Sequence, residues 1–150
     1  MQSTTGDVGM NVRRLGIIAL SAAIAACAGT PGPGDSGYPY NVDGAYTGSI
    51  TVNNVPFSGS LEVEIGDGGA VQGNFTVTQP VAMAIRVTGT VVGNEFTVEM
   101  NYDNNPASGC TTAGTATGTL VIVEGGAELS GPMTITECGQ TLTARLQLTR

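Results

Sequence analysis

Apolar and polar residues alternate with a period of two over most of the chain, starting near residue 46. In the first such stretch, Ile50 and Val52 share one face while Ser49 and Thr51 share the other. Antiparallel strands with one buried face show this alternation, and no window after Ala26 shows the period of a helix. Eight stretches follow the pattern: 46–52, 57–65, 71–77, 81–91, 96–102, 114–122, 129–135 and 142–148. The sequence therefore predicts an all-β domain.

Short turn sequences join consecutive stretches, and only the segment 103–112 is long. Gly93-Asn94, Glu124-Gly125 and Cys138-Gly139 each fit a hairpin that places apolar residues opposite apolar residues. The predicted cross-strand pairs are Gly89 with Val98, Leu120 with Leu129, and Ile135 with Leu142. This connectivity predicts an eight-stranded antiparallel up-and-down meander.

Six of the eight stretches carry a glycine on the inward face: Gly48, Gly59, Gly73, Gly89, Gly118 and Gly131. Inward glycines permit the sharp bending that a sheet needs in order to close on itself. The alternative is a glycine-rich sequence in which the phasing arises by chance. We interpret the glycines as a sign of a closed or nearly closed barrel, which would also remove the exposed sheet edges.

The N-terminal part has the organisation of an export signal. Arg13 and Arg14 precede an apolar stretch, 15–26, that is too short to cross a bilayer as a helix. The residues Ile24-Ala25-Ala26-Cys27 resemble the lipobox of bacterial lipoproteins. That resemblance implies that 1–26 is a lipoprotein signal peptide and that Cys27 is the lipidation site. The alternatives to a lipobox are an ordinary cleaved signal with an incidental cysteine and a buried helix. Met1 and Met10 are both candidates for the first residue of the protein.

After Cys27 the composition changes twice. The segment 28–40 reads AGTPGPGDSGYPY and has no apolar periodicity, so 27–41 is expected to be a flexible Gly/Pro/Ser tether. The segment 42–150 is long enough for one modest core and is expected to form the β-barrel domain. The resemblance to lipoproteins places this domain at the bacterial cell envelope, anchored by the lipid at the outer membrane, on its periplasmic or surface face.

The charge balance limits the partners. The chain has five arginines, no lysine and twelve acidic residues, and removal of 1–26 would leave three basic and eleven acidic residues. Such a surface repels phosphate backbones, so we expect no nucleic-acid binding. Membrane association is expected to come from the lipid on Cys27 and not from a basic patch.

Three cysteines are present, and lipidation would occupy one of them. Cys110 and Cys138 then remain as an even pair in an oxidising compartment, where a disulfide is the expected state. Two free buried thiols are the alternative.

A second resemblance concerns the domain. Gly44-Ala45-Tyr46 in the first predicted strand, the eight-strand meander and the terminal Arg150 resemble the calycin group of lipocalins and avidins. Those families usually have Gly-x-Trp at this point, with a basic residue of the last strand over the ring, whereas this chain has Tyr46. The resemblance implies a lipocalin-like barrel and no particular ligand.

The residue types available exclude much chemistry. Without histidine or lysine, the usual general base, the common nucleophile pairs and the common zinc sites are missing, so no catalytic residue, cofactor or metal is expected. The pairs Glu62/Glu64 and Glu95/Glu99 fall on the outward phase, where we expect a solvated face. Asp67 and the run 103–105 offer oxygen ligands for calcium, but turn formation explains both.

The inward face is the remaining candidate for a binding site. An eight-stranded barrel is either just filled by side chains or holds one small ligand. The aromatic and methionine side chains predicted to line such a cavity are Tyr46, Phe57, Phe75, Met83, Phe96, Met100, Tyr102 and Met133. Two functions remain open: a non-enzymatic lipoprotein whose barrel binds a small apolar ligand, or a structural or protein-interaction module with a filled core that contacts an envelope partner.

Overall fold

The computed structural model describes residues 37–150, which fold into eight antiparallel strands. The predicted signal peptide, the predicted lipidation site Cys27 and most of the predicted tether lie outside the described residues. The strands are β1 (Gly44–Val52), β2 (Val55–Ile65), β3 (Ala70–Gln79), β4 (Met83–Val92), β5 (Glu95–Tyr102), β6 (Gly114–Ile122), β7 (Glu128–Glu137) and β8 (Gln140–Thr149). Two short 3₁₀ turns, η1 (Asp67–Gly69) and η2 (Glu124–Gly126), lie between β2 and β3 and between β6 and β7.

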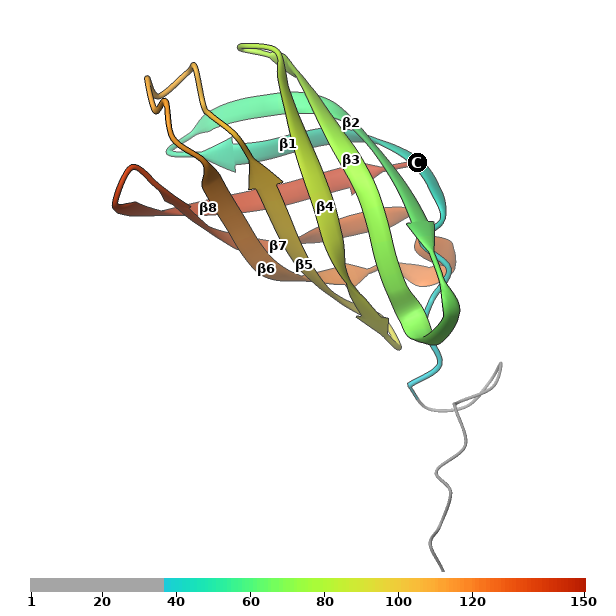
Figure 1. Ribbon diagram of the computed structural model, residues 1–150. Coiled ribbons are helices and arrows are strands. Elements are labelled where there is room, and N and C mark those ends of the chain that lie inside the picture. Colours follow the sequence, from blue (N-terminus) through green and yellow to red (C-terminus); the bar gives the residue numbers. More distant parts are fainter. Residues whose placement is uncertain (1–36) are drawn as a thin grey trace, which may run out of the picture.

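Each strand pairs with its neighbours in the sequence, and β1 pairs with β8, so the sheet is a closed up-and-down barrel (Figure 1). The closing ladder runs from Thr47, opposite Thr149, to Val52, opposite Ala144. The predicted fold class is therefore confirmed. Residues 37–43, the turns after β2, β4 and β6, and the C-terminus lie at one end of the barrel, here called the terminal end. The turns after β1, β3 and β7 and the long loop 103–113 lie at the other, here called the disulfide end.

The predicted register is confirmed for two of the three hairpins. Gly89 pairs with Val98, and Ile135 pairs with Leu142, as the sequence predicts. The prediction for β6 and β7 is wrong by two residues, because Leu129 pairs with Ile122 and not with Leu120. The reason is the loop, since η2 makes the connection longer than the loop predicted at Glu124-Gly125. A shift of two keeps every side chain on its predicted face.

The inward glycines are necessary because neighbouring backbone lies directly over them. A Cβ atom at Gly89 would lie 2.1 Å from the carbonyl oxygen of Thr97, and one at Gly118 would lie 2.3 Å from that of Pro132. At all six positions the nearest atom is a carbonyl oxygen of an adjacent strand, 2.1–2.6 Å away. Such distances are far inside van der Waals contact, so the strands can coil this tightly only where no side chain stands between them.

The inward residues form one core, and the outward ones face solvent. Leu61, Phe75, Phe96 and Leu146 are fully buried. The four carboxylates that the sequence assigns to the outer face, Glu62, Glu64, Glu95 and Glu99, are exposed as predicted.

The terminal end is covered by the chain's own segments. The backbone N–H of Tyr40 donates to Gly93 O (2.9 Å), and the N–H of Gly93 donates to Gly37 O (3.3 Å). Val42 is fully buried. Residues 37–41, which the sequence assigns to the flexible tether, thus bond to the turn between β4 and β5, so the folded part begins before residue 42.

Tyr46 and Arg150 complete this cover. The Tyr46 hydroxyl donates to Gly126 O (2.9 Å), and the Arg150 guanidinium lies over the Tyr46 ring, with Cζ 5.1 Å from the ring centroid. Arg150 also donates to the carbonyl oxygen of Asp43. Burial raises the pKa of Tyr46 although the nearby Arg150 opposes that change. Tyr46 therefore remains a neutral hydrogen-bond donor, and its fully buried side chain fills the barrel interior at this end.

Candidate binding site at the disulfide end

The long loop between β5 and β6 is folded back on itself. Asn105 and Cys110 form a two-way backbone bridge, with N···O distances of 2.9 Å and 3.1 Å. The Asn105 side chain accepts a hydrogen bond from the N–H of Ala107 (3.1 Å), which is the local turn bonding typical of asparagine. Gly109 has a φ of +73°, a conformation that glycine adopts without strain. Turn formation, the predicted role of this asparagine, is therefore confirmed.

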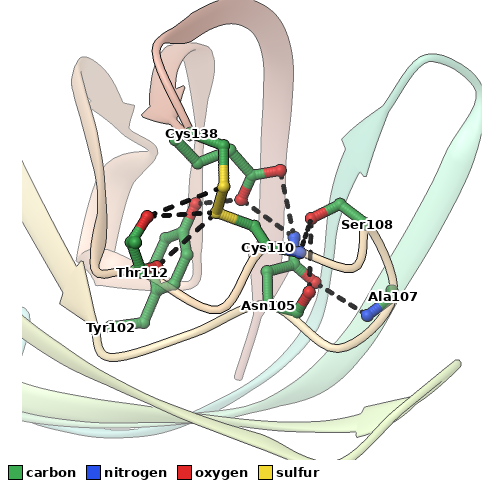
Figure 2. Close-up of a disulfide and its surroundings, with 8 residues drawn as sticks. Tyr102, Asn105, Ala107, Ser108, Cys110, Thr112 and Cys138 are labelled. Carbon is green, nitrogen blue, oxygen red and sulfur yellow. Dashed lines mark hydrogen bonds between the residues drawn. A yellow bond between two sulfur atoms is a disulfide. The ribbon is translucent and has the colours of Figure 1, made fainter.

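A disulfide fastens this loop to the turn between β7 and β8. Cys110 and Cys138 are joined, as predicted, with their Cα atoms 6.0 Å apart, within the usual range for this bond. Cys138 and Gly139 both have positive φ, as a tight hairpin turn requires. Figure 2 shows Asn105 and Ser108 beside the disulfide, so the covalent link and the loop's polar side chains belong to one unit.

A polar cluster lies beneath this loop, formed by Tyr102, Asn105 and Glu137. The Tyr102 hydroxyl donates to Glu137 Oε2 (2.7 Å), and Asn105 Nδ2 donates to the same oxygen (3.0 Å). Asn105 Nδ2 lies farther from Oε1, at 3.4 Å. Only 6% of the Glu137 surface is exposed, and Asn105 and Tyr102 are buried to a similar degree. A carboxylate is thus held in the barrel mouth by neutral donors.

These contacts determine the charge of the cluster. Burial pushes the pKa of the Glu137 carboxyl upward, but hydrogen bonds from Tyr102 and Asn105, together with the nearby Ser108 hydroxyl, outweigh burial and leave the pKa below its ordinary value. Burial, and then the neighbouring Glu137, raise the pKa of the Tyr102 phenol. Near neutral pH, Glu137 is therefore ionised and Tyr102 is a protonated donor.

A cavity of about 430 Å³, open to solvent, lies at the same end of the barrel. This volume is within the range of small-molecule sites. Its walls are mostly apolar, and the polar members are Asn53, Asn105, Ser108 and Glu137. The lining residues are Val52, Asn53, Val55, Phe57, Pro80, Val81, Asn105, Ala107, Ser108, Ile135, Glu137 and Leu142.

Farther inside, the barrel is nearly full. A void of about 30 Å³, room for roughly one water molecule, lies below the mouth and is bordered by Phe57, Met83, Met100 and Tyr102 among others. A ligand the size of the outer cavity therefore fits at the mouth and not along the barrel axis.

The structure divides the eight side chains predicted to line a ligand cavity. Phe57 lines the outer cavity, and Met83, Met100 and Tyr102 join it around the small void. The other four belong to the packed core: Tyr46, Phe75, Phe96 and Met133.

Sequence reasoning missed Glu137 and Asn105 as site residues. Every second residue of the seventh stretch, from Leu129 to Ile135, points inward. Continuing this alternation by two residues predicts that the Glu137 side chain also points inward. Asn105 carries no comparable signal, because it lies in a loop that follows no strand period.

The described residues meet the requirements of neither a metal site nor a membrane-spanning helix. Residues 37–150 contain no group of three or more metal-ligating side chains of the His, Cys, Asp and Glu types. Within the same range, no helix has both the length and the apolar character that crossing a bilayer requires.

Comparison with known proteins identifies no relative: no family model, no curated protein and no solved structure matches the chain.

Proposed function

We propose that this protein is a non-enzymatic lipoprotein of the bacterial envelope whose barrel binds a small, largely apolar ligand at the disulfide end. The observation that carries the proposal is the cavity of about 430 Å³ with apolar walls and one buried carboxylate. The side chains of Phe57, Ile135 and Leu142 supply apolar surface, and burying such surface is the main source of affinity in sites of this size.

The second candidate is a structural or protein-interaction module without a ligand. It is favoured by the near-full interior, since only about 30 Å³ is open beneath the mouth. Under this alternative the mouth would contact an envelope protein and would retain no small molecule.

Two measurements separate these functions. Native mass spectrometry of protein taken from its own envelope should detect a retained small molecule. Calorimetric titration of the full-length protein with octanol should then show binding that Ala107→Trp weakens by about tenfold or more, because the indole fills a mouth lined by Ala107. Ala127→Trp, exposed at the terminal end, is the matched control and should bind octanol as the wild type does. Absence of both a retained molecule and octanol binding would favour the interaction module.

The envelope location is proposed from the lipobox resemblance at Cys27. Replacement Cys27→Ser should release the protein from membranes or leave its precursor uncleaved, as fractionation and mass spectrometry can show. Unchanged membrane partition of a normally processed Cys27→Ser protein would contradict the lipid anchor.

A further inference from the structure

Glu137 is a buried charge without a charged partner among the described residues. The groups bonded to it, from Tyr102 and Asn105, are neutral donors. Ionised groups in protein interiors are ordinarily paired with an opposite charge or a metal, because desolvation of an isolated charge is costly. The hydrogen bonds keep Glu137 ionised but supply no opposite charge, so a cation that enters the mouth would be attracted to this carboxylate.

The arginines of the part of the chain that the structure describes do not reach this position. Three arginines lie in residues 37–150. Arg86 and Arg145 are exposed on the outer faces of β4 and β8, and Arg150 covers Tyr46 at the opposite end of the barrel. The overall charge of −7 also favours the approach of cations over anions.

The carboxylate has unused bonding capacity. Glu137 Oε2 accepts the two short hydrogen bonds, whereas Oε1 has the longer 3.4 Å contact to Asn105 Nδ2. An ionised carboxylate offers about four acceptor positions, so Oε1 can accept further N–H donors. Because Glu137 lines the cavity, a ligand held there lies beside this carboxylate.

We propose that the cavity selects organic cations, in particular amines with an apolar body, and that Glu137 accepts the ammonium N–H groups. This inference deepens the proposed function and rests on it. The apolar body would contact side chains such as Phe57, Val81 and Leu142, which line the same cavity. Tyr102 and Asn105 act as positioning residues, because they hold Oε2 and leave Oε1 to the ligand. An anionic ligand of the same shape would be repelled.

The test compares three probes that share one alkyl chain: octylammonium, octanol and octanoate. Calorimetric titration of the full-length protein at neutral pH and fixed low ionic strength should give the tightest binding for octylammonium. A hydrogen bond to a charged group corresponds to a preference of about 10- to 100-fold over octanol. Octanoate should bind more weakly than octanol.

Glu137→Gln keeps the shape of the side chain and removes its charge. In this variant the preference for octylammonium over octanol should disappear. Glu62→Gln, an exposed carboxylate on the outer face of β2, is the matched control and should preserve the wild-type order. If Glu137→Gln does not fold, the order of the three probes on the wild type still decides the question.

The outcomes distinguish the proposed cation selectivity from the proposed binding of an apolar ligand, on which it rests. Octanol binding equal to octylammonium binding on the wild type, or a preference that survives in a folded Glu137→Gln protein, would overturn the cation site and leave the apolar site standing. If none of the three probes binds, the proposed ligand function fails together with the inference.

Discussion

Loss of the disulfide between Cys110 and Cys138 should lower stability by a predictable amount. The bond spans a sequence separation of 28 residues. On the chain-entropy relation, a loop of that length contributes about 3–4 kcal/mol to the free energy of unfolding. A folded part of roughly 110 residues has an unfolding entropy for which 1 kcal/mol shifts Tm by about 4 °C. Reduction should therefore lower Tm by roughly 12–16 °C.

The expected structural effect of reduction is local. All eight strand pairings, including the β1–β8 ladder, are independent of the disulfide, so the barrel should persist below the new Tm. The loop 103–113 would keep its Asn105–Cys110 bridge but would lose its covalent link to the β7–β8 turn. The hydrogen bond from Asn105 to Glu137 should then weaken, because its donor is carried by that loop.

Differential scanning calorimetry with and without reductant measures the shift, and the strand signal in circular dichroism checks the fold. The double variant Cys110→Ala/Cys138→Ala is the control and should melt at the reduced wild-type temperature, with no response to reductant. A shift below about 3 °C would show that the loop-entropy estimate does not apply to this fold. Two alkylatable thiols at Cys110 and Cys138, in protein prepared without reductant, would refute the bond itself.

Two further predictions concern the glycines and the buried carboxylate. Gly89→Ala should lower the free energy of unfolding by about 3 kcal/mol or more, because its Cβ would lie 2.1 Å from Thr97 O. In the control Gly66→Ala the nearest atom lies 3.7 Å from the Cβ, so this change should be close to neutral. Denaturant unfolding measures both. Comparable effects of the two substitutions would contradict the packing argument. The lowered pKa of Glu137 means that its stabilisation is fully present above about pH 4–5, the range of an unfolded glutamate, and is lost as pH falls through the lower folded value. Urea unfolding should therefore show a steeper acid loss for wild type than for Glu137→Gln, and equal slopes would refute the role of these hydrogen bonds.

The sequence by itself determined the class of fold. Period-two alternation fixes which side chains of a strand share a face, and this depends only on local backbone geometry. Short turns then set the register of a hairpin, as the pairing of Gly89 with Val98 illustrates. The prediction failed for β6 and β7, where η2 lengthened the connection, because turn length is harder to read from sequence than strand phase. The same alternation extends to Glu137 and indicates its inward position.

Only the tertiary structure decided where along the barrel each inward residue lies. Phe57 and Phe96 share the inward phase, yet Phe57 lines the mouth and Phe96 is in the core, since tilt and stagger of the strands set the height of each side chain. The meeting of Asn105 with Glu137 depends on a contact across 32 residues that no local pattern encodes. The closing ladder between β1 and β8 likewise joins the two ends of the domain. Such contacts join residues far apart in the sequence and exist only when the whole barrel is folded. The candidate site is built from contacts of this kind.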